Sequence, residues 1–74
     1  MMRIKNGAEM QLTVYINMGD GYHIHAVGTH VTVTHPHIEL DEEGYVPPAP
    51  MWVMVTTKDG KTIGVRHCEI EPRK

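Results

Sequence analysis

Apolar and polar residues alternate with a period of two in the first third of the chain. Every second position from residue 10 to residue 18 is apolar: Met10, Leu12, Val14, Ile16 and Met18. Because successive side chains of a strand point to opposite faces, this stretch predicts a strand with one buried face. Gly19-Asp20-Gly21 interrupts the pattern, since glycine accepts the positive φ that a tight turn requires.

The alternation resumes after this turn. The returning strand has two faces, formed by Tyr22, Ile24 and Ala26 on one side and by His23, His25 and Val27 on the other. We therefore predict a β-hairpin over residues 10–27. Residues 1–9 before it are mostly polar, and Asn6-Gly7 within them indicates a turn.

A third strand is predicted over residues 29–34, with Val31 and Val33 facing inward. Pro36 ends it, because proline has no N–H to donate to a neighbouring strand. Residues 35–50 are then the longest irregular stretch. A domain this small cannot leave so long a segment unpacked, so we expect an ordered excursion. Four of its residues are expected to hold it against the sheet: Ile38, Leu40, Tyr45 and Val46.

The last third of the chain contains a strong hairpin signal, Lys58-Asp59-Gly60 between two β-rich runs. A two-residue turn would face Val55 away from Ile63. A three-residue loop with its glycine in the left-handed conformation instead pairs Val55 with Ile63 and Val53 with Val65. We predict the three-residue loop, because it places four β-branched side chains on one face.

The segment from His67 to Pro72 is too short for another long strand. We expect a single 3₁₀ turn that brings Ile70 into the core, followed by a short strand. No stretch of the chain repeats apolar residues at the spacing of a helix of three turns. The sequence therefore predicts an all-β domain.

From Gly28 onward, the order of features resembles the small SH3-like barrels of bacterial and phage proteins. The segments that carry the resemblance are GTHVTV, a long loop, WVMVTTKDGKTIGV and CEIEP. In those domains a first strand enters a long loop, a tight Asp-Gly hairpin follows, and a brief helical turn leads to a last strand. The resemblance covers about residues 28–72. It implies one domain over residues 1–74, a barrel with the hairpin 10–27 added to it. Such barrels bind peptides, RNA or larger subunits, so the fold does not choose a function.

Composition narrows the class of protein. The chain has 74 residues, seven Lys and Arg against nine Asp and Glu, and a formal charge of -2, which argues against binding driven by phosphate neutralisation. It contains no apolar run of about 20 residues and no signal-peptide pattern. A single cysteine, Cys68, cannot form an internal disulfide, which favours a reducing compartment, so we predict a cytoplasmic protein. We also expect the Cys68 side chain to be buried in the fold. Since phenylalanine is absent, we expect Trp52, the three tyrosines, the methionines and many valines to fill the core.

Catalytic motifs are missing from the sequence. It has no nucleophile elbow, no phosphate-binding Gly-Lys-Ser/Thr and no zinc-protease helix motif. His67 and Cys68 are adjacent, and adjacent side chains of an extended chain point apart, so they cannot act together as base and nucleophile. We predict that the protein is not an enzyme.

The leading functional hypothesis is a small module that binds a larger protein, as a regulator or inhibitor of bacterial, phage or mobile-element origin. Aromatic residues and methionine are enriched in interface cores, and acidic residues beside them would attract a basic partner. The predicted surface consists of Glu39, Asp41, Glu42, Glu43, Tyr45, Met51 and Trp52. Either a monomer or a small homo-oligomer is compatible with the sequence.

Two alternatives remain open. Lys58, Lys61 and Arg66 follow one hairpin and form a modest basic patch for nucleic acid, although such lysines more often solubilise an edge. Six histidines are also unusual in so short a chain, and they include two pairs with i, i+2 spacing, which could bind zinc or another divalent metal, protonate as a pH switch, or simply face solvent. The two pairs are His23 with His25 and His35 with His37.

Overall fold

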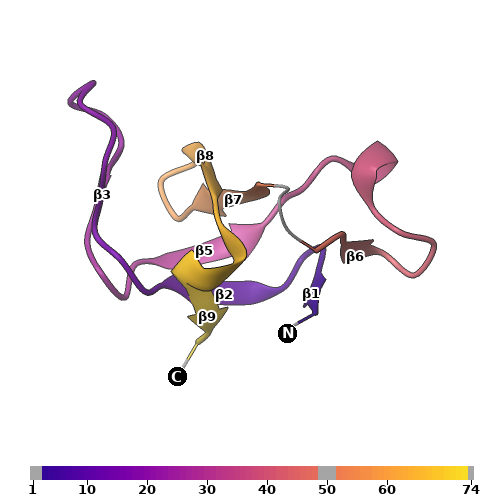
Figure 1. Ribbon diagram of the computed structural model, residues 1–74. Helices are drawn as coiled ribbons and strands as arrows, with labels where there is room; N and C mark the ends of the chain where they lie inside the picture. The colour runs from indigo at the N-terminus through magenta and orange to yellow at the C-terminus, as the bar shows by residue number, and fades with distance from the viewer. Residues whose placement is uncertain (1–2, 49–51, 74) are drawn as a thin grey trace.

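The computed structural model describes residues 3–48 and 52–73, and its regular structure is extended (Figure 1). Nine strands and two 3₁₀ turns are found in these ranges, and no α-helix occurs among them. The prediction of an all-β fold is confirmed. In the part of the chain that the structure describes, no helix is long and apolar enough to cross a membrane.

A five-stranded antiparallel sheet forms the centre of the molecule. From one edge to the other its strands are β8 (Thr62–Val65), β7 (Val53–Thr57), β5 (His30–Val33), β2 (Glu9–Leu12) and β9 (Ile70–Pro72). Among the described strands, the edge strands β8 and β9 do not pair with each other, so hydrogen bonding does not close the sheet into a barrel. Strand β2 lies inside this sheet, which therefore extends beyond the expected range of 28–72.

The β7–β8 hairpin has the register predicted from the sequence. Val55 pairs with Ile63 and Val53 with Val65, and all four side chains are buried. Gly60 has φ +88°, which is the left-handed conformation expected at the end of a three-residue loop. Loop length and the need to bury one face were sufficient to determine this register.

The core is aliphatic. Its buried members are Ile4, Met10, Leu12, Val31, Val33, Val46, Val53, Val55, Ile63, Val65 and Ile70. The alternation on β2 and β5 thus identified the correct inward faces. The expectation of buried aromatic rings was wrong, because Trp52 and two of the three tyrosines are exposed and the third, Tyr45, is half-buried. Valines on short strands fill this small interior without them.

A 3₁₀ turn at His67–Glu69, labelled η2, precedes β9 and brings Ile70 into the core, as predicted. The Glu69 carboxylate accepts the backbone N–H of Arg66 at 2.7 Å, which satisfies a donor that the turn itself leaves unpaired. Cys68 is exposed, so the prediction of a buried cysteine was wrong. Cys68 lies within the turn, none of whose residues is buried, whereas Ile70 follows the turn as the first residue of β9.

The chain before residue 9 contributes a strand that the sequence did not predict. β1 (Ile4–Lys5) pairs with β6 (Tyr45–Val46), with Ile4 opposite Val46 and both side chains buried. This pairing holds the excursion between β5 and β7 as an ordered segment, as expected. The 3₁₀ turn η1 (His37–Glu39) lies within it. Ile38 was expected to pack against the sheet but is 94% exposed, because it lies on the outer side of η1.

The predicted hairpin at 10–27 is divided into two parts. Its first residues form β2 in the main sheet, whereas β3 (Ile16–Asn17) and β4 (Ile24–His25) pair only with each other and project from one end of the molecule (Figure 1). A bend at Thr13 and Val14 separates the two parts. On β4 it is His25 that is buried, while the apolar Ile24 is exposed. The bend interrupts the strand, so the inward and outward positions of β2 do not predict which residues of the arm face inward.

Candidate functional site

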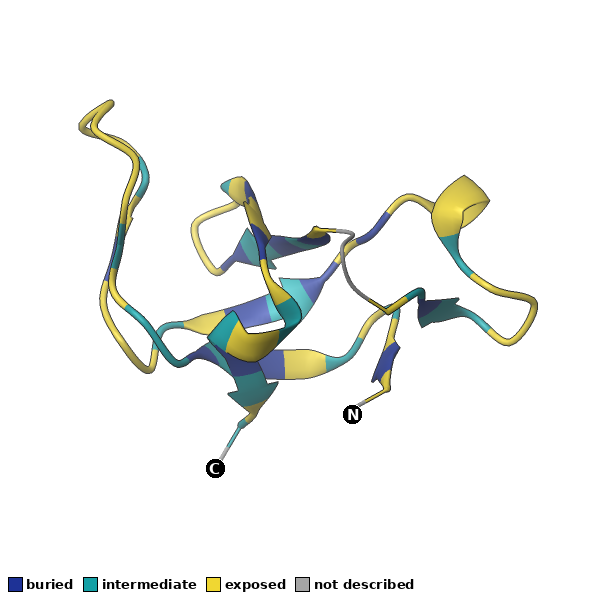
Figure 2. Cartoon of the chain, viewed as in Figure 1, coloured by how far each residue is buried: buried dark blue, intermediate teal, exposed yellow. Residues whose placement is uncertain are grey.

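The projecting arm, residues 13–28, displays most of the exposed apolar side chains of the molecule. Among the described residues, seven large hydrophobic side chains are exposed, and five of them belong to the arm. These five are between 49% and 70% exposed: Tyr15, Met18, Tyr22, Ile24 and Val27. The tip of the arm is exposed, and exposed residues recur along both strands between half-buried positions and the buried His25 (Figure 2). A single exposed hydrophobic residue is ordinary, whereas several on one element are unusual, and this makes the arm the candidate site.

The tip of the arm is an organised turn. One carboxylate oxygen of Asp20 accepts the backbone N–H groups of Tyr22 and His23, each at 2.8 Å. Its other oxygen lies 2.6 Å from His23 Nδ1, and Asn17 Oδ1 accepts the Gly19 N–H at 2.9 Å. The hydrogen bonds that the Asp20 carboxylate accepts favour its charged form, and the one from the His23 backbone N–H has the largest effect. They hold the pKa of Asp20 far below its ordinary value. The turn is therefore held by its own side chains.

The arm is also attached to the rest of the molecule. Lys61 on the β7–β8 hairpin donates from Nζ to the Tyr22 carbonyl oxygen at 2.6 Å, and Asp59 lies 3.5 Å from the same nitrogen. Thr57 donates its hydroxyl to the Asp59 carboxylate, and this hydrogen bond is the largest cause of the lowered pKa of Asp59. At the base of the arm, the Thr13 hydroxyl donates to the Cys68 carbonyl at 3.0 Å. The arm is thus contacted near both its tip and its base.

Part of the negative charge of the predicted acidic surface is balanced by Arg3 of the same chain. Nη2 of Arg3 lies 3.8 Å from Asp41 and 3.9 Å from Glu43, and its guanidinium stacks 3.9 Å from the centre of the Tyr45 ring. Asp41 also accepts the backbone N–H groups of Glu43 and Tyr45, each at 2.9 Å. Glu42 is exposed in the same loop. The acids and Tyr45 therefore form one group, and Arg3 occupies part of it.

Trp52, the other predicted anchor, belongs to a different set of contacts. Its ring is 52% exposed and lies 5.6 Å from the Arg66 guanidinium, and its Cβ is next to Gly64 on β8. Glu39 lies on η1, with its carboxylate 3.5 Å from His35. Met51 falls outside the described residues. The predicted surface is thus distributed over several elements and does not converge on one anchor pair.

Two members of the basic patch contact groups of the chain itself. Lys61 holds the arm, and Arg66 lies over Trp52. Lys58 is exposed in the turn between β7 and β8. The nucleic-acid hypothesis stays a prediction. One of its three residues, Lys61, already donates a hydrogen bond to the arm.

The two histidine pairs are separated by the length of the molecule. His23 and His25 belong to the arm, and His35 and His37 belong to the η1 excursion at the opposite end (Figure 1). The rings of His23 and His25 meet edge to face with centroids 6.2 Å apart, and His23 also contacts Asp20. Within residues 3–48 and 52–73, no three His, Cys, Asp or Glu side chains converge in a way that could hold a metal ion.

The sequence contained a signal for the arm that periodicity obscured. Residues 13–28 include only one formally charged side chain, Asp20, and apolar residues occur at both odd and even positions, Tyr15 between Val14 and Ile16 and Val27 on the same face as His23 and His25. A solvated ribbon would carry more charge. Comparisons with protein-family models, with curated proteins and with solved structures found no match, so the arm stands as the candidate site on the chain's own geometry.

Proposed function

We propose that this chain is a non-catalytic module that binds a larger protein through its arm, residues 13–28. The observation that carries the proposal is the concentration of exposed Tyr, Met, Ile and Val side chains on an element that contributes little to the core. Tyrosine and methionine are enriched at the centres of interfaces, where they fill apolar pockets of the partner.

The hydrogen bonds of the arm support binding with a low cost in ordering. An isolated two-stranded ribbon is marginally stable in water. Here Asp20 and Asn17 organise the tip, and Lys61 holds it against the β7–β8 hairpin. A preorganised surface loses less conformational freedom on association, so more of the contact free energy appears as affinity.

The charge of the arm indicates the chemistry of the partner. Asp20 is its one formally charged residue, and that carboxylate is already used within the turn. The partner surface is therefore an apolar groove rather than a basic or acidic patch. The acidic group at Asp41 and Glu43 could steer the encounter, although Arg3 balances part of its charge.

The SH3-like architecture and a cytoplasmic location belong to the same proposal. Support for the architecture comes from the order of the tight β7–β8 hairpin, the 3₁₀ turn η2 and the last strand β9, which is the order found in those domains. Support for a reducing compartment comes from the exposed thiol of Cys68, which would be exposed to oxidation elsewhere.

Affinity capture from cells that naturally express the chain tests the proposal. The variant carries Tyr22→Ser and Val27→Ser, both at exposed positions of the arm, and the matched control carries Ile38→Ser, an exposed position on η1. We expect the arm variant to lose its partner and the control to retain it. Equal capture by both variants would contradict the proposal.

The same experiment separates the other hypotheses. Capture through the arm should persist after nuclease treatment, in the presence of a chelator, and as salt is raised. A binder of nucleic acid would lose affinity steeply with salt, since counterions are released when phosphates are neutralised. Loss of all capture with chelator would instead favour the histidine pairs.

A further inference from the structure

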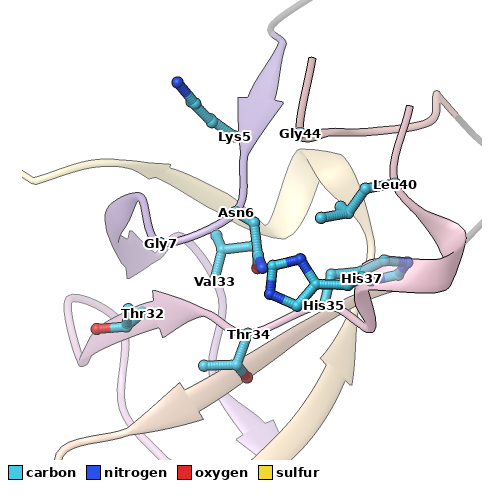
Figure 3. A pocket seen from close by; sticks show the side chains of 10 residues that line it. All are labelled: Lys5, Asn6, Gly7, Thr32, Val33, Thr34, His35, His37, Leu40 and Gly44. Carbon is cyan, nitrogen blue, oxygen red and sulfur yellow. The ribbon is translucent and has the colours of Figure 1, made fainter. Parts of the chain in front are cut away.

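An open depression lies between the β1–β2 turn, the end of β5 and the η1 excursion (Figure 3). Two polar atoms at its border, Asn6 Oδ1 and His35 Nε2, are buried without a hydrogen-bond partner in the described part of the chain. The Asn6 side chain lies toward the His35 ring, so neither atom reaches the opening. The edge of the main sheet at β8 differs from this depression, because its backbone groups are exposed.

This edge of the sheet is open. β8 pairs with β7 on one side and, among the described strands, with none on the other (Figure 1). An unpaired edge is a template for another strand, and proteins normally block it with proline or charged residues. The opposite edge, β9, ends in Pro72, which has no N–H to donate. β8 itself contains neither a proline nor a charged residue.

The hydrogen bonds of the hairpin determine which backbone groups of β8 are open. Thr57 donates its N–H to the Lys61 carbonyl at 2.8 Å. Hydrogen-bonded and non-hydrogen-bonded pairs alternate along an antiparallel ladder, so the two buried residues of β8 are the ones that bond to β7. The N–H and carbonyl groups of Thr62 and Gly64 therefore point away from β7. Both residues are exposed, and the exposed surface of a glycine is its backbone.

Nothing within the described chain requires a glycine at position 64. Gly64 is the one described glycine whose φ is not positive. A Cβ added there would lie 3.4 Å from Met54 Sδ and 3.8 Å from Trp52 Cβ, which are ordinary contact distances. Glycine inside a strand weakens it and often marks the close approach of another backbone. The missing side chain leaves space on the outer face of the sheet, beside the exposed Trp52.

The flanks of β8 are basic. The stretch from Lys58 to Arg66 carries three basic residues and one acid, Asp59, in a chain whose formal charge is -2. Asp59 lies 3.5 Å from Lys61 and offsets part of this charge. The Arg66 guanidinium lies 5.6 Å from the centre of the Trp52 ring, and no carboxylate of a described residue is within 4 Å of it. Arg66 is thus a cation available to a partner at one end of the open edge.

We propose that β8 binds an extended segment of a partner protein as an added antiparallel strand, with an aromatic residue of the segment at Gly64 and an acidic residue at Arg66. The main chain of the segment would exchange hydrogen bonds with Thr62 and Gly64, and its side chains would supply specificity. The residue paired with Gly64 lies on the outer face, where its ring fills the space beside Trp52. Because the strands are antiparallel, the residue that faces Arg66 precedes the aromatic one by two positions.

A second copy of this chain fits the edge less well than a foreign acidic segment. Lys61 and Arg66 flank β8. If two β8 strands lay side by side, the basic residues of one copy would come next to those of the other, whether the strands ran parallel or antiparallel. Like charges in facing positions destabilise a sheet. An acidic segment is instead attracted by the same charges.

A suitable probe is the acetylated and amidated hexapeptide Thr-Glu-Val-Tyr-Val-Thr, and its matched controls are two singly N-methylated forms. In the proposed register the tyrosine N–H faces Gly64, whereas the N–H of the valine before it points away from β8. Titrations are followed by NMR of the protein backbone amides. We expect saturable shifts at Thr62 and Gly64. Methylation at the tyrosine should weaken binding about tenfold or more, as for one lost hydrogen bond, and methylation at the valine should leave it nearly unchanged.

Charge reversal tests the role of Arg66. Arg66→Glu should weaken peptide binding about fivefold or more, because attraction becomes repulsion. Lys58→Glu, at an exposed position outside β8, is the matched control and should change it less than about twofold. The arm variant with Tyr22→Ser and Val27→Ser should bind the peptide as the unaltered chain does, so the result is independent of the arm and its partner.

Several outcomes would overturn the proposal. They are the absence of saturable shifts at millimolar peptide, equal binding by the two methylated peptides, and unchanged affinity in the Arg66 variant. Shifts confined to the arm would also contradict it. So would a dimer formed through β8 that excludes the peptide, or a thymidine oligonucleotide that displaces the peptide from Thr62 and Gly64.

Discussion

The molecule contains two hairpins with similar turns and opposite environments. One turns at Lys58-Asp59-Gly60 between β7 and β8, and the other at Gly19-Asp20-Gly21 in the arm. An aspartate accepts hydrogen bonds in each turn. The alternate residues of β7 and β8 nevertheless pack into the core, whereas five large apolar side chains of the arm stay exposed. Turn chemistry alone therefore does not determine burial.

The neighbours of each hairpin account for the difference. β7 pairs with β5 on its other side, so its hairpin extends a sheet whose inner face covers the core. β3 and β4 pair only with each other, and local hydrogen bonds stabilise them. Elements with few buried contacts lie at the low-stability end of a structure and often carry binding surfaces. The same local motif thus serves the core in one place and recognition in the other.

The largest expected difference in the free energy of unfolding comes from replacing one valine by alanine in each hairpin. Val55→Ala removes two methyl groups from a fully buried position and should cost about 2–3 kcal/mol in the free energy of unfolding. Val27→Ala, at an exposed position of the arm, should change it by less than about 0.5 kcal/mol. Urea denaturation of both variants measures the difference. Similar losses would mean that the arm is packed, and the comparison would fail.

A second prediction concerns the β7–β8 turn. No atom lies within 4 Å of a Cβ added at Gly60, so Gly60→Val meets strain from its φ of +88° rather than a clash. The left-handed conformation should cost about 1–2 kcal/mol or more for this β-branched residue. Asp59→Asn keeps the backbone and should cost less. Thermal unfolding of the two variants tests this ranking, and equal shifts in Tm would contradict the three-residue loop.

A third prediction uses pH to perturb the tip of the arm. Because the folded state lowers the pKa of Asp20, its ionised form stabilises the arm above the ordinary value of 3.8, and this contribution is lost as the pH falls below it. NMR titration of the Asp20 carboxyl carbon should give a midpoint well below 3.8, together with changes at the Tyr22 and His23 amides. Asp20→Asn should remove that pH dependence at both amides. A midpoint at the ordinary value would show that the turn does not form.

The smallest expected effect comes from the attachment of the arm. Lys61→Met removes the hydrogen bond to the Tyr22 carbonyl and should change the free energy of unfolding by less than about 1 kcal/mol. The backbone amides of the arm should become more mobile in ¹⁵N relaxation, while those of β7 should not. Lys58→Met, in the same exposed turn, is the matched control. Unchanged relaxation in the Lys61 variant would mean that the arm is held without this contact.

Local patterns predicted the parts of the fold that depend on local geometry. The β7–β8 register followed from the length of the loop and the positions of the β-branched residues. The 3₁₀ turn before the buried Ile70 followed from a segment that is too short for another long strand. The inward faces of β2 and β5 followed from alternation. In each case neighbouring residues determine the outcome, so the sequence contains enough information.

Prediction failed where residues far apart in the chain decide the outcome. Ile4 is buried only because β1 pairs with β6, whose residues lie far along the chain. His35 lies in the irregular segment expected for it, but the sequence did not indicate that its ring is buried, where Nδ1 accepts the Met54 backbone N–H. The candidate arm was missed for a similar reason, since its exposure depends on which strands remain without a neighbour.

The order of amino acids alone determined where this chain extends and where it turns, because steric limits on φ and side-chain alternation act over a few residues. Only the tertiary structure decided which extended segments meet, which face of β4 is inward, and that Asn6 and His35 border one open depression. Those outcomes depend on burial summed over distant segments, and burial exists only once the segments have come together.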